Sequence, residues 1–403
     1  MTDIFGTLGP SCASREILAE MFREGMTGIR LNLSHISLRE SEKQLEILHA
    51  AALDAGVRPL LLVDMQGPEL RVGRLKAPLM LCEGDKALLC REDLPDEERV
   101  RIRRRSGAVI PVPGVVCEAL QKGAEVLMDD GRLLLKVTEI LDGGICVEAV
   151  ILRGGMLSGR KSVKVTDAEI YAPTMTCADL QNIRDAVSYG VTGIMQPFVR
   201  CREDLETVRG ALLDNHAGEL RLVAKIENRQ GMRQLESLLP VCDAVCIARG
   251  DLGNDMDLWE LPSSQKEIAA ACRAAGRYFM VATQMLSSME KCAVPTRAEL
   301  NDIFNTVADG AGGVMVTGET AVGKYPVDVI RYLSRTAASG EKYRKQLQRG
   351  NARGDVLIAG VKTHVYPTQD RWRRTTPYAG AESVIPVSAG SRPMRKSRRS
   401  PWS

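Results

Sequence analysis

Val223-Ala224-Lys225-Ile226-Glu227-Asn228, followed by Ala248-Arg249-Gly250-Asp251-Leu252-Gly253, is the part of the sequence that decides the fold. Each stretch ends an apolar, β-prone run, Leu220–Ile226 in the first case and Ala244–Ala248 in the second. About one helix of sequence lies between the two runs, so they predict neighbouring parallel strands of a β/α protein. In such proteins the carboxyl ends of the strands share one face, where ligands bind.

The polar residues at these two strand ends suit the chemistry of phosphate groups. Glu227 and Asp251 offer the hard oxygen ligands that Mg²⁺ takes from proteins. Lys225 lies two residues before Glu227 and therefore on the same side of its strand, where it can neutralise a transferring phosphoryl group. Gly250 and Gly253 allow backbone amides to approach an anion at the start of the next helix. The alternative reading of Lys225 and Glu227 is an exposed ion pair with no chemical role.

The composition is that of a soluble globular protein with more than one domain. The chain has 403 residues, of which 44% are hydrophobic and 26% charged. No apolar run reaches the roughly 18 residues of a membrane helix, and the N-terminus lacks a basic-then-apolar signal, so a cytoplasmic protein that does not enter a membrane is predicted. Several of the 11 cysteines lie in apolar runs, which predicts buried, reduced thiols.

The net charge of +3 hides an asymmetry between the body of the chain and its end. Residues 341–403 hold 14 Lys and Arg against 4 Asp and Glu, whereas the remainder holds 40 against 47. Beyond about Tyr343 the hydrophobic periodicity stops, and we predict a basic, disordered tail over residues 346–403. The tail could bind nucleic acid through its arginines and Trp372 and Trp402, but no nucleic-acid fold motif accompanies it, and a solvated or artefactual tail is favoured.

Strands and helices alternate on both sides of a short all-β region. Three strands precede that region and five follow it, which is the number for a (β/α)8 barrel. The expected strands are Ile4–Leu8, Gly28–Leu33, Pro59–Asp64, Thr192–Gln196, Leu220–Ile226, Ala244–Ala248, Tyr278–Ala282 and Gly313–Thr317. The expected helices are Glu16–Arg23, Leu38–Ala52, Cys177–Tyr189, Arg202–Leu213, Arg229–Leu238, Ser263–Ala275, Arg297–Ala308 and Pro326–Ala337.

The intervening region consists of short alternating runs separated by Gly, Pro and Asp turns, which predicts a small β-domain over residues 68–165. Its expected strands are Ala108–Val112, Glu125–Met128, Leu133–Ile140 and Ile145–Ile151. Residues 1–67 and 166–345 then form the catalytic barrel.

Motifs spread along residues 1–345 resemble those of the pyruvate kinase family, in the order of that family. Besides the two stretches above they are Thr7-Leu8-Gly9-Pro10-Ser11, Arg30-Leu31-Asn32-Leu33-Ser34-His35, Asp64-Met65-Gln66-Gly67-Pro68-Glu69-Leu70-Arg71, Met128-Asp129-Asp130-Gly131, Val281-Ala282-Thr283-Gln284-Met285-Leu286, Pro295-Thr296-Arg297-Ala298-Glu299 and Thr317-Gly318-Glu319-Thr320-Ala321. The resemblance implies a (β/α)8 TIM barrel with a small β-barrel domain inserted after the third strand. By comparison with the family, the usual C-terminal α/β domain is expected to be missing or truncated, and a frameshifted or truncated reading frame would account for its absence. We then expect reduced or altered oligomerisation and no activation by fructose bisphosphate.

The same resemblance implies a reaction and its residues. A pyruvate kinase transfers the phosphoryl group of phosphoenolpyruvate to ADP, giving pyruvate and ATP in glycolysis. Lys225 and Arg30 would bind the phosphoryl group, and Thr283 would belong to a proton relay beside the pyruvate methyl carbon. Gly250 and Asp251 would bind substrate, and Asp251 with Glu227 would hold Mg²⁺ or Mn²⁺.

A second cation, K⁺, is implied by the resemblance. Its ligands would be the side chains of Asn32, Ser34 and Asp64 and the backbone carbonyl of Met65. Glu69 stands where K⁺-dependent members of the family carry glutamate. His35 and Arg71 are similar to residues on the nucleotide side.

Four positions depart from the usual family pattern. Gln66 replaces a usual lysine and Pro197 a usual serine, while Gln230 replaces glutamate and Thr317 replaces serine. Gln66 removes a positive charge beside the phosphate site, and Pro197 removes a hydroxyl and a backbone donor. A catalytically impaired protein that still binds phosphoenolpyruvate or nucleotide is therefore the alternative function. A related barrel enzyme such as an aldolase would lack the inserted domain.

Overall fold

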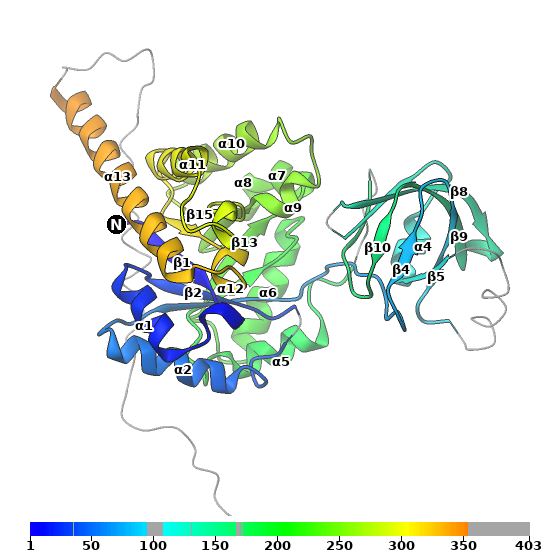
Figure 1. The fold of residues 1–403 in the computed structure, drawn as a ribbon, viewed down its shortest axis with the longest axis horizontal. Helices are drawn as coiled ribbons and strands as arrows, with labels where there is room; N and C mark the ends of the chain where they lie inside the picture. The colour runs from blue at the N-terminus through cyan, green and yellow to red at the C-terminus, as the bar shows by residue number, and fades with distance from the viewer. Residues whose placement is uncertain (35, 95–107, 130, 167–169, 171, 354–403) are drawn as a thin grey trace, which may run out of the picture. The chain divides into compact units, whose positions relative to one another are not determined.

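The structure is a computed structural model that describes residues 1–34, 36–94, 108–129, 131–166, 170 and 172–353. Eight parallel strands close into a barrel, in which each strand pairs with its neighbours and β1 pairs with β16 (Figure 1). The strands are β1 (Asp3–Thr7), β2 (Gly28–Asn32), β3 (Leu60–Asp64), β12 (Gly193–Gln196), β13 (Arg221–Ile226), β14 (Ala244–Ala248), β15 (Tyr278–Ala282) and β16 (Gly313–Met315). The predicted TIM barrel is confirmed.

Helices follow the strands and surround the barrel (Figure 1). The predicted helix Arg229–Leu238 is broken into two short helices at Gln234, and the short helices α9 and α12 were not predicted. The helices are α1 (Arg15–Arg23), α2 (Glu42–Asp54), α5 (Cys177–Ala186), α6 (Arg202–Asp214), α7 (Arg229–Arg233), α8 (Leu235–Leu238), α9 (Arg249–Gly253), α10 (Leu261–Ala274), α11 (Arg297–Ala308), α12 (Gly318–Ala321) and α13 (Pro326–Arg353), with one-turn helices η1 (Pro10–Cys12) and η3 (Ser287–Glu290).

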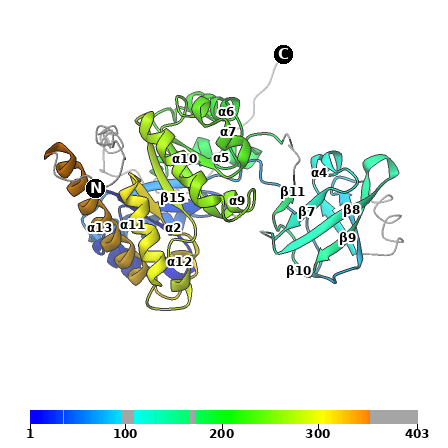
Figure 2. The same cartoon turned by 90° about the horizontal axis from the view of Figure 1, so that it is seen from above.

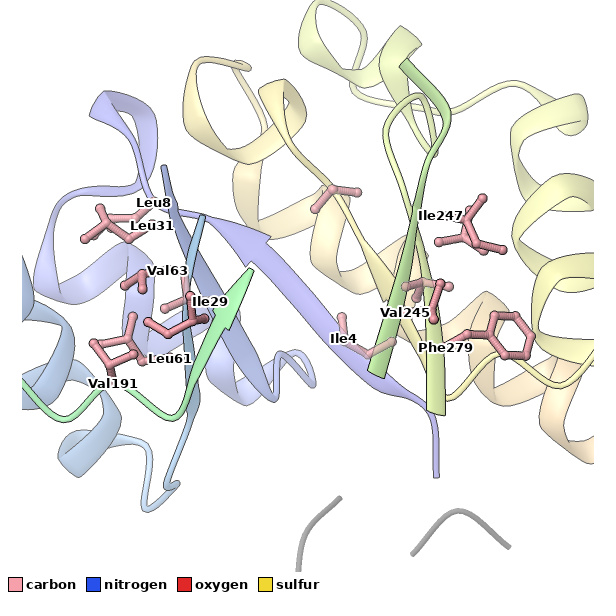
Figure 3. Close-up of a cluster of buried hydrophobic side chains, with 14 of the residues drawn as sticks. Ile4, Leu8, Ile29, Leu31, Leu61, Val63, Val191, Val245, Ile247 and Phe279 are labelled. Carbon is pink, nitrogen blue, oxygen red and sulfur yellow. The ribbon is translucent and has the colours of Figure 1, made fainter. Parts of the chain in front are cut away.

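The alternation of side chains along each strand separates the hydrophobic core from the barrel interior. Ile29, Leu61 and Val63 belong to the large core between strands and helices, and Figure 3 shows them grouped there. Arg30 pairs in register with Leu62, and both lie outside that cluster of core residues, on the interior side of the barrel. Burial of one such aliphatic side chain stabilises the fold by about 1.5–3 kcal/mol. The core therefore leaves the interior positions near the strand ends available to charged side chains.

The segment between β3 and β12 carries a separate β-structure with its own buried core. Its six-stranded sheet has the order β11-β7-β8-β9-β5-β6, and β10 pairs with β4. Figure 2 shows β7, β8, β9 and β11 of this sheet with α4. The helix α4 (Gly114–Ala119) contributes Val116 and Cys117 to this core and was not predicted. The strands are β4 (Leu79–Leu81), β5 (Lys86–Arg91), β6 (Ala108–Val112), β7 (Glu125–Met128), β8 (Leu133–Leu141), β9 (Cys146–Arg153), β10 (Gly155–Leu157) and β11 (Val163–Val165), with the turn η2 (Asp142–Gly144).

The last helix, α13, is longer than the sequence indicated. It runs to Arg353, so residues 346–353 are helical, whereas they were assigned to the tail. It packs beside α11 and α1, and the buried Glu341 accepts a hydrogen bond from the backbone N–H of Thr2. Contacts between residues so far apart in the chain leave no hydrophobic periodicity in the sequence. The end of α13 was therefore predicted too early. The rest of the predicted tail, residues 354–403, lies outside the described residues.

Two further sequence expectations concern the burial of the cysteines and the lack of membrane helices. Seven of the 11 cysteines are buried in the structure, which agrees with their positions in apolar runs. In the parts of the chain that the structure describes, every helix is too short or too polar to cross a bilayer.

Candidate active site

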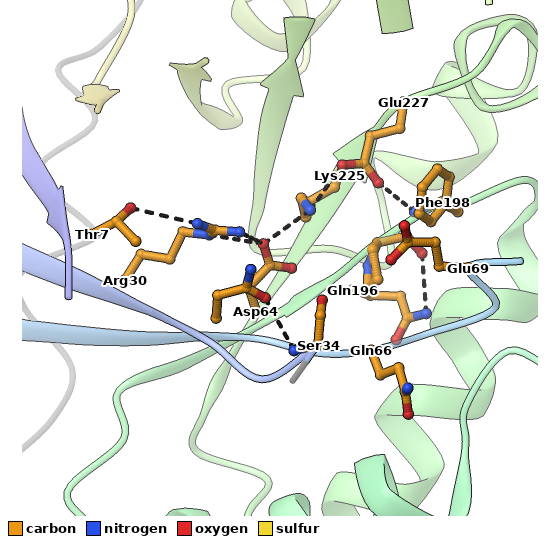
Figure 4. Close-up of polar contacts among 12 residues, drawn as sticks. Thr7, Arg30, Ser34, Asp64, Gln66, Glu69, Gln196, Phe198, Lys225 and Glu227 are labelled. Atoms are coloured by element: carbon orange, nitrogen blue, oxygen red, sulfur yellow. Dashed lines mark hydrogen bonds and ion pairs between the residues drawn. The ribbon is translucent and has the colours of Figure 1, made fainter. Parts of the chain in front are cut away.

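A line of alternating charges crosses the barrel interior at the carboxyl ends of β2, β3 and β13 (Figure 4). Arg30 Nη2 lies 2.6 Å from Asp64 Oδ2, and Lys225 Nζ lies 3.0 Å from the same oxygen. Lys225 Nζ also lies 2.8 Å from Glu227 Oε1. The side chain of Asp64 is 2% exposed and that of Lys225 is 12% exposed, so these charges interact in a poorly solvated space. The structure thus brings together four residues that the sequence had selected.

The charge states in this line follow from burial and from the neighbouring charges. Burial alone would raise the pKa of Asp64, but the charges of Lys225 and Arg30 outweigh it and hold the pKa below its usual value. Burial would lower the pKa of Lys225, but Asp64 and Glu227 raise it above its usual value. Burial, with the nearby charges of Asp251 and Asp64, raises the pKa of Glu227 to about 7, although Lys225 opposes the shift. Lys225 is therefore fully charged at neutral pH.

Three predicted ligands of a monovalent cation lie together at the ends of β2 and β3. Asn32 pairs in register with Asp64, and Asn32 Oδ1 accepts a hydrogen bond from the backbone N–H of Ser34 at 3.1 Å. Asp64 Oδ1 is buried and accepts no hydrogen bond from any residue that the structure describes. Met65 follows Asp64 directly, and its N–H donates to the carbonyl of Met195. A bound cation such as K⁺ would satisfy this buried carboxylate oxygen.

Glu227 and Asp251 are the two predicted ligands of a divalent cation. Glu227 is 2% exposed, and its Oε2 accepts a hydrogen bond from the backbone N–H of Phe198 at 2.7 Å. Asp251 lies in the first turn of α9 and close enough to raise the pKa of Glu227. Within the described ranges, no three His, Cys, Asp or Glu side chains form a cluster that could hold a metal ion. Two carboxylates without histidine or cysteine fit Mg²⁺, which keeps several waters, better than Zn²⁺.

Thr283 follows β15 and lies against the start of α9. A Cβ atom on Gly250 would lie 3.0 Å from Thr283 Cγ2, so glycine permits this close approach. Thr283 and Gln284 have φ angles of 76° and 56°, in the left-handed region. Such a conformation costs about 1–3 kcal/mol for a residue other than glycine and is concentrated at functional sites. The structure therefore places Thr283 beside Gly250, and the roles assigned to the two residues stay predictions.

Glu69 and Arg71 form an ion pair after β3. Arg71 Nη2 lies 2.6 Å from Glu69 Oε2, and Arg71 Nη1 donates to the carbonyl of Arg160 at 2.8 Å. Burial raises the pKa of Glu69 more than the charge of Arg71 lowers it. The assignment of Arg71 to the nucleotide stays a prediction. His35, assigned to the same side, lies outside the described residues.

The sequence reasoning missed Asp179, a fully buried residue in the first turn of α5. Its carboxylate accepts hydrogen bonds from the N–H groups of Gln66 at 2.8 Å, Gly67 at 3.0 Å and Thr176 at 2.8 Å. It thereby fixes the loop that carries the Met65 carbonyl. The capping-box pattern Thr176-x-x-Asp179 was visible in the sequence, but the long-range contacts to Gln66 and Gly67 were not.

We expect Asp179→Asn to lower the free energy of unfolding by about 2–3 kcal/mol. The asparagine forms weaker, neutral hydrogen bonds, and its side-chain NH₂ group faces backbone N–H groups that need an acceptor. Urea unfolding of the purified variant measures this change. Glu203→Gln is the control, because Glu203 also lies in the first turn of a helix, α6, but is exposed. This substitution should leave the urea midpoint unchanged. Equal midpoints for the parent and Asp179→Asn would contradict the assigned role.

Two departures from the family pattern lie in the same loop region. The side-chain Oε1 of Gln66 accepts a hydrogen bond from Thr176 Oγ1 at 3.2 Å, so this neutral amide is engaged at the start of α5. Gly67 has a φ of 58°, and a Cβ there would lie 2.5 Å from Pro197 Cγ. Glycine at 67 is therefore needed both for the backbone and for the contact with Pro197.

The fold and the site define a (β/α)8-barrel protein with a charged ligand-binding end and a β-structure inserted after the third strand. The comparisons with known proteins agree. The family model described as "Pyruvate kinase, barrel domain" matches residues 1–330, and the chain belongs to the pyruvate kinase family.

Curated relatives are similar over most of this chain. The chain is 33% identical to the pyruvate kinase of Thermococcus litoralis over 348 residues, which are 86% of this chain and 71% of that protein. It is 33% identical to the pyruvate kinase of Chlamydia pneumoniae over 341 residues, covering 85% and 69% of the two chains. The pyruvate kinase of Methylorubrum extorquens is also 33% identical, over 342 residues, with 85% and 69% covered.

Proposed function

We propose that this chain transfers the phosphoryl group of phosphoenolpyruvate to ADP, giving pyruvate and ATP. The observation that carries the proposal is the position of Lys225. Its ammonium lies between two buried carboxylates, 3.0 Å from Asp64 and 2.8 Å from Glu227, at the ligand-binding end of a barrel. A lysine held in this way keeps its charge although little of it is exposed to water, which suits the stabilisation of a transferring phosphoryl group.

Arg30 and Lys225 would bind the phosphoryl group from two sides. Asp64 lies between them and orients both cations, since each contacts the same carboxylate oxygen. The fixed guanidinium suits the ground-state phosphate, whereas the lysine suits the charge that develops during transfer. A divalent ion on Glu227 and Asp251, when bound, supplies further positive charge to the phosphoryl oxygens. The backbone of Gly250, at the start of α9, would orient the substrate carboxylate.

Thr283 would take part in the protonation of the enolate that remains after transfer. A threonine hydroxyl is too weak an acid to act unaided, so it would pass a proton from a donor in a hydrogen-bonded chain to the methylene carbon. Its position against Gly250 supports this role, because the substrate carboxylate and the methylene carbon belong to the same small molecule.

The reaction is tested by following pyruvate formation from phosphoenolpyruvate and ADP with Mg²⁺ and K⁺, in parallel with Lys225→Met. Pyruvate formed by the parent and lost in the variant supports the proposal. If the folded parent makes no pyruvate but binds phosphoenolpyruvate in calorimetry, the impaired binding protein is the better account. The neutral Gln66 side chain, engaged with Thr176, favours that second candidate.

A further prediction concerns monovalent cations. We expect turnover to fall by about 10-fold or more when K⁺ is replaced by tetramethylammonium at constant ionic strength, because the buried Asp64 Oδ1 then lacks a cation. Initial rates at increasing KCl measure the effect, and choline chloride controls for chloride. Full turnover in buffer free of K⁺ and Na⁺ would contradict the prediction.

A further inference from the structure

Arg249 makes an unusual set of contacts with the segment that carries Thr283. Its Nε and Nη2 donate to the carbonyl of Thr283 at 3.1 and 2.9 Å, and Nη2 also donates to the carbonyl of Gln284 at 3.0 Å. These carbonyls belong to the two consecutive residues with left-handed φ angles. One guanidinium therefore contacts both strained peptide units at once.

Asp302 fixes the guanidinium from the opposite side. Asp302 Oδ2, on α11, lies 2.7 Å from Arg249 Nη1, and the arginine side chain is only 10% exposed. Arg249 begins α9, directly after β14, and Thr283 directly follows β15. Ala248 and Ala282 pair in register, so Arg249 and Thr283 start from adjacent points on the barrel rim. The contact is thus set by the rigid strands and by α11.

We propose that Arg249, oriented by Asp302, is a positioning residue that holds the Thr283–Gln284 turn in its left-handed conformation and so aims the Thr283 hydroxyl at the substrate. The catalytic part of this inference rests on the proposed function; the conformational part does not. A planar guanidinium is needed because a lysine ammonium cannot reach two carbonyls and a carboxylate with the same fixed fork. The next part of the loop has a separate anchor, since the N–H of Leu286 donates to Glu319 Oε1 at 3.1 Å.

Because of this second anchor, loss of the Arg249 contacts should loosen residues 283–284 without unfolding the loop. The variant Arg249→Lys keeps the charge and loses the fork. We expect its kcat for pyruvate formation to fall by about 10- to 100-fold, since a small misplacement of a reacting group has an effect of this size. The KM for phosphoenolpyruvate should change by less than about threefold, because the binding cations are untouched. Asp302→Asn should show a smaller loss of kcat.

Arg209→Lys is the matched control. Arg209 Nη2 lies 2.8 Å from Asp243 Oδ2 and donates to the carbonyl of Val241 at 3.2 Å. It is thus also a guanidinium that joins a carboxylate to a backbone carbonyl. Arg209 lies on α6, and its partners Val241 and Asp243 directly precede β14, at the end of the barrel opposite the site. Its replacement should leave kcat unchanged.

Two readouts separate positioning from a merely structural role. The first is the exchange of pyruvate methyl protons with D₂O, followed by NMR with Mg²⁺, K⁺ and ATP present. In this exchange a methyl proton leaves carbon for solvent and a deuteron takes its place, so it reports proton transfer without phosphoryl transfer; it should fall with kcat in Arg249→Lys. The second is amide hydrogen exchange of peptides that cover residues 283–286, which should quicken in Arg249→Lys and Asp302→Asn but not in Arg209→Lys.

The measurements distinguish failure of the proposed function from failure of the inference about Arg249. A parent that forms no pyruvate overturns the proposed function and the catalytic part of this inference, while amide exchange still decides whether Arg249 holds the turn. Unchanged amide exchange in Arg249→Lys overturns the inference, as does an equal loss of kcat in Arg249→Lys and Arg209→Lys. If Arg249→Lys does not fold, Asp302→Asn decides on the same two readouts.

Discussion

Replacing Lys225 by methionine is expected to lower the kcat for pyruvate formation by about 1000-fold or more. Removal of one fixed donor that acts on transition-state charge costs about 100- to 1000-fold in other enzymes, and here a full positive charge is removed. The KM for phosphoenolpyruvate should change far less, because Arg30 remains and still contacts Asp64 at 2.6 Å. Steady-state rates measured with saturating Mg²⁺ and K⁺ give both constants.

The fold should survive this substitution for a specific reason. Without Lys225, Glu227 would be a buried carboxylate without its cation. Burial already raises its pKa with the lysine present, so loss of Lys225 favours the neutral, protonated carboxyl over an unpaired buried charge. The circular dichroism spectrum of the variant should therefore stay close to that of the parent, which shows that the loss of kcat is not a loss of fold.

Lys266→Met provides the comparison for Lys225→Met. Lys266 also pairs with a carboxylate, Asp309, at 2.5 Å, but its side chain is 59% exposed. The control should retain full activity. If Lys225→Met were to keep more than about a tenth of the parent's kcat, the assignment of transition-state charge to this lysine would be wrong.

Asp64→Asn is expected to have the largest effect on stability. The substitution keeps the shape of the side chain but leaves Arg30 and Lys225 facing each other across a neutral amide in a buried space. Removal of one partner from a buried ion pair typically costs about 3–5 kcal/mol. Turnover should also be lost, since the same carboxylate orients both cations and supplies an oxygen to the predicted K⁺ site. Urea unfolding and the pyruvate assay measure the two effects.

The stability effect of Asp64 has a defined pH dependence. Because the pKa of Asp64 is lower in the folded protein than in the unfolded chain, its contribution is present above the unfolded value of about 4. It is lost as the pH falls through the lower, folded value. The difference between the parent and Asp64→Asn should therefore shrink on acidification below about pH 4.

A matched substitution, Asp54→Asn, should show no such difference. Asp54 also pairs with an arginine, Arg15, at 2.6 Å, but on the surface. Similar losses of stability in Asp54→Asn and Asp64→Asn would mean that burial does not govern the effect.

Much of the barrel could be predicted from the sequence, because its strands are short, apolar and separated by amphipathic helices. All eight barrel strands lie within about two residues of the predicted positions, as the run before Glu227 illustrates. The short helices α9 and α12 escaped prediction, since four or five residues give no measurable period. The strand β5 was missed because its apolar run, Ala87–Cys90 between Lys86 and Arg91, lacks the alternation expected of strands in this domain.

At the site, residue types and strand ends predicted which side chains converge, but not how they are arranged. Lys225 and Glu227 could be placed on one side of β13 by their spacing alone. That Arg30 and Lys225 share one oxygen of Asp64 depends on the register between β2, β3 and β13, which a single sequence does not encode locally. The left-handed turn at Thr283 likewise gave no signal, because neither Thr283 nor Gln284 is a residue that favours positive φ.

The pairing of β1 with β16, which closes the barrel, affects how the protein folds. The backbone N–H of Thr7, on β1, donates to the hydroxyl of Thr320, a residue 313 positions away. One edge of β1 can form its hydrogen bonds only after β16 has been synthesised. Contacts so distant in sequence make folding slow, since the entropy of a long loop must be lost before they form. The β-structure between β3 and β12 has its own core and mainly local strand pairings, so it can fold before the barrel closes. During synthesis, the unpaired edge of β1 stays exposed until almost the entire barrel has left the ribosome.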